Sequence, residues 1–136
     1  MRTVLQIIEK AGGWNPGLFL KIANAPYMDL VIEAIEEGPS GLPSVSITHY
    51  GEQDGDLMCD SEMCFELKDG QLDASYYRND YAGVEQWSRN NIRGQYVFLV
   101  LLHQQHQRFA RTWDNNLRCQ GFAEAYDLQQ LSLIHI

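Results

Sequence analysis

The sequence lacks both a hydrophobic run that could cross a membrane and a paired set of cysteines. Its longest strongly apolar stretch, residues 97–102, is far shorter than the roughly 20 residues of a membrane helix, and its first residues lack the apolar core of a signal peptide. Cys59, Cys64 and Cys119 do not have the C-x-x-C spacing of a zinc site, so we expect reduced thiols. These absences favour a cytoplasmic protein that does not associate with membranes.

Positive charge is missing from a long part of the first half of the chain. Between Ile22 and Leu67 there is no lysine or arginine, whereas the same stretch holds ten carboxylates. The formal net charge is −8, and all of it lies in residues 1–70, which hold twelve acidic and four basic residues. Such a field repels phosphates, so direct binding of nucleic acid is disfavoured. The favoured partners are a protein with a basic surface or a metal ion.

The motifs of several common enzyme classes are also absent. The sequence contains no P-loop, no dinucleotide fingerprint, no H-E-x-x-H and no G-x-S-x-G. The carboxylates that follow Asp54 are spaced partly like a calcium loop, but Phe65 stands at the twelfth position, where an EF-hand requires glutamate. The familiar nucleotide, zinc-protease, serine-hydrolase and EF-hand interpretations therefore have no support.

The length and composition are those of one globular domain. Hydrophobic residues make up 45% of the 136 residues and charged residues 21%, which argues against disorder and against a second domain. The last six residues match the translation of a transposon-end adapter used in sequencing libraries. We therefore expect a single domain over residues 1–130 and a non-native tail at residues 131–136.

Apolar spacing and breaker residues predict the first elements. The apolar residues of 4–11 recur at helical spacing and stop at Gly12, which predicts a short amphipathic helix. Residues 18–24 and 29–35 have the pattern of two strands joined by a turn at Pro26.

The last third of the chain has a helical pattern. Apolar residues at steps of three or four predict a helix over residues 95–118, with a shorter helix at 84–91 before it. Residues 96–102 remain open between helix and strand, because periodicity does not separate the two in a short apolar run. His106 lies on the apolar stripe, which favours a core histidine with a satisfied hydrogen bond over a metal ligand.

Two Asp-Gly dipeptides, at residues 54–55 and 69–70, are strong hairpin signals. They predict a three-stranded antiparallel meander made of residues 44–53, 56–67 and 71–79. A two-residue turn at each dipeptide sets the register by counting. Gln53 then faces Asp56, His49 faces Asp60, and Asp60 also faces Asn79.

Strand alternation sorts this meander into two faces. The predicted core face holds Thr48, Tyr50, Leu57, Cys59, Met63, Phe65, Leu67, Leu72, Ala74 and Tyr76. The other face is polar and acidic, and its candidate binding residues are His49, Gln53, Asp56, Asp60, Glu62 and Asn79. Val45 and Ile47 fall on the polar face and do not fit this register. A bulge near residues 59–62 would re-sort every side chain beyond it.

The histidine of the acidic face is the best candidate for chemistry. With Asp60 opposite, His49 could act as an oriented general base, and His49 with Asp60 and Glu62 could hold a divalent metal. The competing interpretation is a solvent-facing cross-strand pair worth a few tenths of a kcal/mol. A third interpretation is that the acidic face is a docking surface.

Several segments resemble a family of small uncharacterised bacterial proteins that are often encoded on phages, plasmids and conjugative elements. The resemblance rests on PYM at residues 26–28, LVIE at 30–33, GLP at 41–43, HYGEQDGDLM at 49–58, DSEM at 60–63, WDNNL at 113–117 and QGF at 120–122. In the family pattern, Asn-Gly stands at 54–55 and Asp-Pro-Glu-Met at 60–63. The resemblance implies a gene neighbourhood, and it implies no reaction.

Together these observations predict an α+β domain, with an antiparallel sheet of about five strands and N- and C-terminal helices packed on one face. They favour a non-catalytic accessory protein of a mobile element that binds a basic protein through its acidic sheet face. One concrete form of this role would be inhibition of a host defence nuclease. The alternative is a metal-dependent hydrolytic enzyme that uses His49 and the neighbouring carboxylates, and the divalent metal is the only cofactor that either hypothesis calls for.

Overall fold

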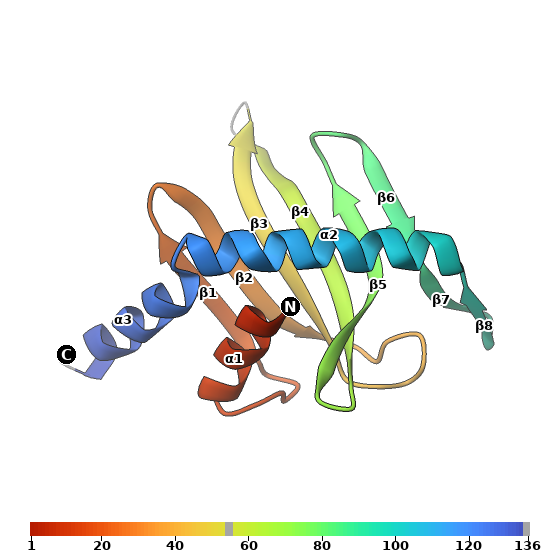
Figure 1. The fold of residues 1–136 in the computed structure, drawn as a ribbon, viewed down its shortest axis with the longest axis horizontal. Helices are drawn as coiled ribbons and strands as arrows, with labels where there is room; N and C mark the ends of the chain where they lie inside the picture. The colour runs from red at the N-terminus through yellow and green to blue at the C-terminus, as the bar shows by residue number, and fades with distance from the viewer. Residues whose placement is uncertain (54–55, 135–136) are drawn as a thin grey trace.

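The protein is an α+β domain in which six antiparallel strands form one sheet in sequence order (Figure 1). The computed structural model describes residues 1–53 and 56–134, and the side chains of residues 1–51 and 59–133. The sheet consists of β1 (Phe19–Asn24), β2 (Tyr27–Ile35), β3 (Ser44–Gln53), β4 (Asp56–Lys68), β5 (Gln71–Asn79) and β6 (Val84–Trp87). A two-stranded hairpin of β7 (Arg89–Ile92) and β8 (Gln95–Phe98) follows it. The predicted fold class is confirmed, with one more strand in the main sheet than expected.

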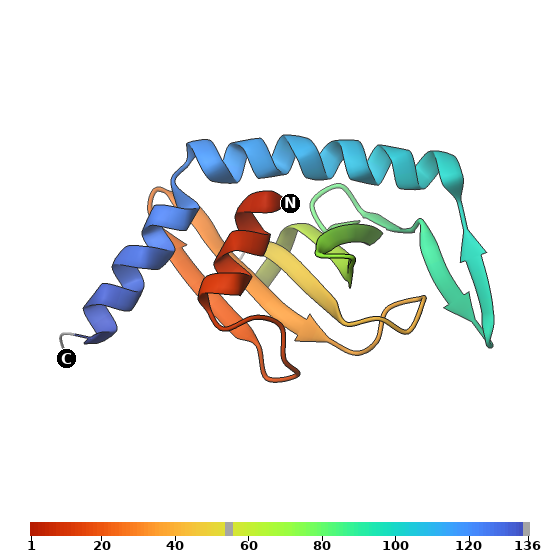
Figure 2. The same ribbon diagram turned by 60° about the horizontal axis from the view of Figure 1, so that its bottom comes forward.

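The helices lie on one side of this sheet (Figure 2). They are α1 (Arg2–Lys10), α2 (Val100–Cys119) and α3 (Phe122–Ile134). α1 is the predicted amphipathic helix, whose residues Val4, Ile7 and Ile8 are buried in the core. α2 crosses the strands and α3 continues beside β1. We call the opposite side of the sheet, over which no helix of the described chain lies, the helix-free face.

The turn between β4 and β5 explains why the predicted hairpin forms. Asp69 and Gly70 both have positive φ, 52° and 72°, as a type I′ turn requires. The pairs next to it, Leu67 with Leu72 and Lys68 with Gln71, are those expected from the sequence. The other predicted turn, at residues 54–55, lies outside the described residues, although the expected pair of Gln53 with Asp56 adjoins it.

Two register shifts separate the observed pairing from the predicted one. His49 pairs with Ser61 and Tyr50 pairs with Cys59, so Asp60 is an extra residue in β4. A second shift lies between Cys64 and Phe65, where the partners in β5 are Tyr76 and Ala74. The predicted pair of His49 with Asp60 is therefore wrong, because counting from the turns assumed strands without bulges.

The second predicted partner of Asp60 is also wrong. Asn79 pairs with Val84 of β6, and its side-chain oxygen accepts a hydrogen bond from the N–H of Ala82 in the turn between β5 and β6. Next to β4, the N–H of Asp80 donates to the carbonyl of Cys59. Asn79 therefore stabilises a turn and does not join the candidate site.

The bulges exchange the faces of several side chains. His49 lies on the helix side, where the buried residues Val45, Ile47, Met63 and Phe65 form the core, and this explains why Val45 and Ile47 did not fit the predicted polar face. Thr48, Tyr50, Cys59 and Tyr76, predicted for the core face, pair across the strands with residues of the helix-free face. Met63, Phe65, Leu72 and Ala74 are core residues as expected.

The segment before α2 differs most from the prediction. Residues 84–91, expected to be helical, form β6 and the start of β7, and the helix expected from residue 95 begins at Val100. Arg93 and Gly94 have φ values of 55° and 84°, and they close the β7–β8 hairpin in a type I′ turn. Residues 96–102, which the sequence left open between helix and strand, contain both: β8 extends to Phe98, and α2 begins at Val100.

A buried ion pair connects this hairpin to the sheet. Glu66 and Arg89 have side chains that are 1% and 4% exposed, and their charged groups are 2.5 Å apart. The second carboxylate oxygen of Glu66 accepts hydrogen bonds from the N–H groups of Ser40 and Leu42. A Cβ on Gly38 would lie 2.2 Å from Cγ of Glu66, so the loop after β2 approaches this carboxylate too closely for any larger residue.

We predict that Glu66→Gln lowers the free energy of unfolding by about 3 kcal/mol, because it leaves the Arg89 guanidinium buried without its main counterion. The expected loss lies at the lower end of the range for breaking a buried ion pair, because the carboxylate of Asp73 remains 3.4 Å from the guanidinium. Urea denaturation measures the change. The matched control is Glu33→Gln at an exposed position, which should change the free energy by less than about 0.5 kcal/mol. Equal effects of the two substitutions would contradict the structural role of the pair.

Candidate functional site

The residues predicted to form one site are divided between the two faces of the sheet. His49 and Asp60 line one cleft on the helix side. Glu62 lies on the helix-free face, where it accepts a hydrogen bond of 2.6 Å from the hydroxyl of Ser46. The side chains of Gln53 and Asp56 lie outside the described part of the structure. The candidate catalytic pair of His49 and Asp60 thus stays together, but without Glu62.

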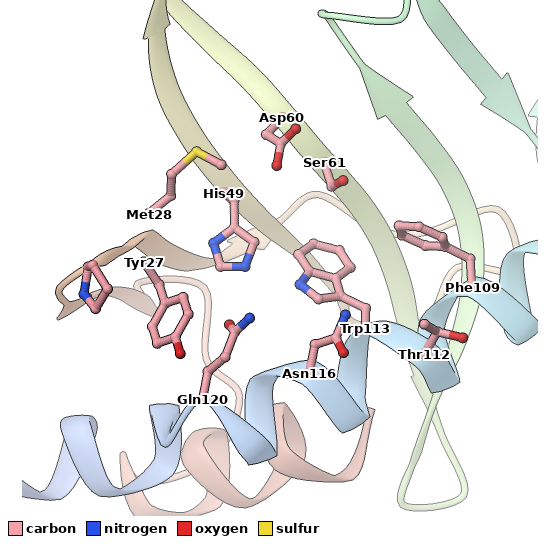
Figure 3. Close-up of a pocket in the computed structure, with 11 residues that line it drawn as sticks. Tyr27, Met28, His49, Asp60, Ser61, Phe109, Thr112, Trp113, Asn116 and Gln120 are labelled. Atoms are coloured by element: carbon pink, nitrogen blue, oxygen red, sulfur yellow. The ribbon is translucent and has the colours of Figure 1, made fainter.

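The cleft lies between the β1–β2 turn, the middle of β3 and β4, and the C-terminal half of α2 (Figure 3). It has a volume of about 420 Å³, within the usual range for small-molecule sites. Its lining combines aromatic rings with hydroxyl, amide and carboxylate groups. The lining residues are Pro26, Tyr27, Met28, His49, Asp60, Ser61, Phe109, Thr112, Trp113, Asn116 and Gln120.

His49 lies at the centre of this lining. The residue is 9% exposed, and its ring packs against Trp113 and Phe122, with ring centroids 5.4 Å and 5.6 Å away. Nδ1 lies 3.2 Å from the carbonyl oxygen of Asp29, and since a carbonyl only accepts, Nδ1 carries the proton. Burial lowers the pKa of His49 below 6.5, and the bond to Asp29 and the charge of Asp60 offset part of this effect. The ring is therefore neutral near pH 7, and Nε2 is its acceptor.

One side of α2 supplies the opposite wall of the cleft. Phe109, Trp113, Asn116 and Gln120 follow one another at steps of three or four, so they project from one side of the helix. Trp113 is 5% exposed and packs on Phe109 at 6.0 Å. The sequence predicted an apolar stripe on this helix, and the two amides were not identified as part of a site. The signal that could have found the amides is their continuation of that stripe.

A network of charges occupies the middle of the helix-free face. Arg78 pairs with Asp80 at 2.8 Å and lies 3.7 Å from Glu62. Asp80 also accepts the N–H of Cys59 at 2.8 Å. The bonds from Arg78 and from Cys59 hold the pKa of Asp80 at about 2. These carboxylates are already engaged within the protein.

The thiols of this region are poor nucleophiles. Burial, with the charge of Glu62 adding to it, raises the pKa of Cys59 and of Cys64 to about 12. All three cysteines are free, as expected, and only Cys119 is exposed.

Aromatic side chains surround the charge network. The ring of Tyr76 packs against that of Trp87 in a tilted arrangement, with centroids 5.1 Å apart, and its hydroxyl donates a hydrogen bond to Glu85. Trp87 is 45% exposed, and Phe19 on β1 is 58% exposed. Among the described side chains and outside the buried pair, the face has the carboxylates of Asp29, Glu33, Glu62, Asp80 and Glu85 and the basic groups of Lys21 and Arg78. The face is thus acidic with exposed aromatic rings.

The predicted metal shell is not assembled in the described part of the chain. His49 and Glu62 lie on opposite faces, and no three histidine, cysteine or carboxylate side chains among those described are placed to hold one ion. His106 is a core residue, as expected. Its ring nitrogens lie 3.1 Å from the Ser88 hydroxyl and 3.1 Å from the Gln86 side-chain oxygen.

Comparison with protein families decides the relationship of this chain. The model of the domain of unknown function DUF6908 matches residues 2–123. The chain belongs to this family. Comparisons with curated proteins and with solved structures give no match. No helix in residues 1–53 and 56–134 has the length and apolarity needed to cross a membrane. The matched residues include all strands of the sheet and the helices α1 and α2, and the DUF6908 family has no assigned activity.

Several of the segments behind the resemblance seen in the sequence meet at one place in this DUF6908 domain. Apart from Phe109 and Thr112, every residue lining the cleft comes from the segments at residues 26–28, 49–58, 60–63, 113–117 and 120–122. These segments are far apart in the chain, and the sheet register and the course of α2 bring them together.

We predict that the free energy of unfolding decreases as the pH falls from 7 to 5. Burial lowers the pKa of His49 and of His106 below 6.5, so the unfolded chain binds protons more readily than the folded protein in this range. The contribution of the two neutral histidines to the free energy of unfolding is complete above about pH 6.5, and it is lost as the pH falls further because the unfolded chain then binds protons. Urea denaturation at several pH values measures the trend, and an NMR titration of His49 tests its cause. A pKa of His49 above 6.5 would contradict the assignment.

Proposed function

We propose that this DUF6908 protein is a non-catalytic binding module that holds a basic partner protein on its helix-free face. The observation that carries the proposal is the uncovered side of the six-stranded sheet. Exposed aromatic rings of Phe19 and Trp87 stand there among the carboxylates of Glu33, Glu62 and Glu85.

The chemistry of this face suits protein recognition. Tryptophan and tyrosine residues are enriched among the residues that dominate binding energy at protein interfaces. Tyr76 and Trp87 pack against each other, so they lose little conformational freedom when a partner covers them. The surrounding carboxylates attract lysine and arginine residues and speed the encounter. The net acidic charge therefore favours a basic partner.

The same groups are unsuited to catalysis. Glu62 and Asp80 are held by Ser46, Arg78 and the N–H of Cys59. The thiol of Cys59, which lies among them, has a pKa near 12. A general base or nucleophile needs a pKa near the working pH and access to substrate. These facts support a role in binding rather than in chemistry.

A mobile-element accessory protein in the cytoplasm is the setting that we propose. A defence nuclease binds nucleic acid with lysine and arginine residues, and carboxylates on a sheet face compete with phosphates for the same residues. The acidic first half of the chain supports this form of inhibition, because its charge is concentrated in the strands that form the face.

The test is a charge reversal at two exposed positions of the face, Glu33→Lys with Glu85→Lys. A partner first captured from host cells is purified, and its dissociation constant is measured by calorimetry against wild-type and variant proteins. We expect the reversal to weaken binding by at least about tenfold, since two attractive charges become repulsive. Thermal stability should change little because both side chains are exposed.

The matched control reverses two exposed carboxylates on the helix side, Glu9→Lys with Glu124→Lys. This variant carries the same change in net charge, so it should bind the purified partner within about twofold of wild type. Equal losses in both variants would show only a general charge effect. Unchanged binding in the face variant would refute the proposal.

A further inference from the structure

The polar groups that line the cleft near His49 are rich in hydrogen-bond acceptors. Asp60 contributes a carboxylate, and His49 contributes Nε2, because Nδ1 is bound to the carbonyl of Asp29. Asn116 of α2 and Gln120, the residue that caps the C-terminal end of α2, add side-chain amides. No lysine or arginine is among the described side chains of the lining. The cleft therefore presents a negative site without an internal counterion.

The walls of the cleft offer aromatic faces beside these acceptors. The rings of Tyr27 and Trp113 lie on either side of the His49 ring, and Phe109 extends the wall beyond Trp113 (Figure 3). A cation is attracted to the face of an aromatic ring, and most strongly to that of tryptophan. A neutral ligand would gain less from the carboxylate than a cation would, and an anion would be repelled by it.

We infer that this cleft binds an organic cation, and that a guanidinium group is its ligand. A guanidinium is planar, so it can stack on an aromatic wall while its N–H groups point to acceptors in the same plane. Asp60 can accept two of these N–H groups, and the amide oxygens of Asn116 and Gln120 and Nε2 of His49 are further acceptors. A volume of about 420 Å³ leaves room for the aliphatic chain that carries the group.

This site is separate from the helix-free face. His49 and Asp60 lie on the helix side of the sheet, whereas the carboxylates of the proposed protein-binding surface lie on the other side. The inference therefore does not rest on the proposed function, and each can fail without the other.

The experiment is an NMR titration of the isotope-labelled protein with free arginine. We expect saturable shifts of the side-chain amides of Asn116 and Gln120 and of the Trp113 indole, with a dissociation constant of about 1 mM or below. Citrulline, which carries a neutral ureido group of nearly the same shape, should bind at least about tenfold more weakly. Equal responses to arginine and citrulline, or no saturable shift with either, would overturn the inference.

Two matched variants assign the effect to the cleft. Asp60→Asn removes the carboxylate of the lining, and Glu9→Gln makes the same chemical change at an exposed position of α1 that does not line the cleft. Arginine binding should weaken by at least about tenfold in the first variant and stay within about twofold of wild type in the second. Similar losses in both would indicate a general charge effect and would also overturn the inference.

A third ligand distinguishes the two sources of a guanidinium. Nα-acetyl-arginine N-methylamide has the blocked ends of an arginine within a protein chain. Binding as tight as that of free arginine assigns the cleft to an arginine side chain of another protein. Binding at least about tenfold weaker than that of free arginine assigns it to a small molecule with free ends.

Discussion

A β-strand alternates its side chains between two faces, so one inserted residue exchanges the faces of all residues beyond it. In β4 this residue is Asp60, which stands between the partners of His49 and Tyr50. Because of it, Cys59 pairs with Tyr50 on the helix-free face while Met63, also an odd-numbered residue of β4, pairs with Ile47 in the core. Which residues share each candidate surface depends on this bulge and, in β5, on the second register shift beside Cys64 and Phe65.

The two faces of the sheet have different physical roles. The helix side buries the apolar residues of β2 to β5 under α1 and α2, and it leaves a cleft where His49 meets the amides of α2. The helix-free face has polar and charged side chains. Its buried pair of Glu66 and Arg89 joins the β2–β3 loop and the β7–β8 hairpin to the sheet. The stabilising apolar contacts and the exposed acidic surface are therefore on opposite sides.

The sequence predicted correctly those turns and helix ends that depend only on neighbouring residues. Gly12 ends α1 as expected, and Asp69 with Gly70 forms the expected turn because these residue types tolerate positive φ. Arg93 and Gly94 were expected only to separate two helices, and the hairpin turn that they form was not predicted, since arginine is not typical of its position. α3 was not predicted, because its apolar residues do not gather on one side of the helix, although Phe122 and Tyr126 anchor it in the core.

The candidate site could be predicted only in part, because it depends on pairing between distant residues. His49 and Asp60 were recognised as neighbours, and they do line one cavity. Their setting was not predicted, since the misfit of Val45 and Ile47 pointed to a bulge near residues 59–62 without fixing its position, and the second register shift, beside Cys64 and Phe65, was not foreseen. Tyr27 and Trp113, which form two walls of the cleft, lie far apart in the chain, and the packing of α2 across the sheet brings them together. The acidic residues of the first half of the chain predicted a negatively charged surface, but they did not show which carboxylates lie together on the helix-free face.

The orientation of His49 is the central claim, and a two-dimensional NOE spectrum of the labelled protein tests it most directly. The account predicts cross-peaks from the His49 ring protons to the indole of Trp113 and to the ring of Phe122, whose centroids lie 5.4 Å and 5.6 Å away. Cross-peaks from the same protons to the side chain of Glu62, with none to Trp113, would contradict it, because they would place His49 on the helix-free face.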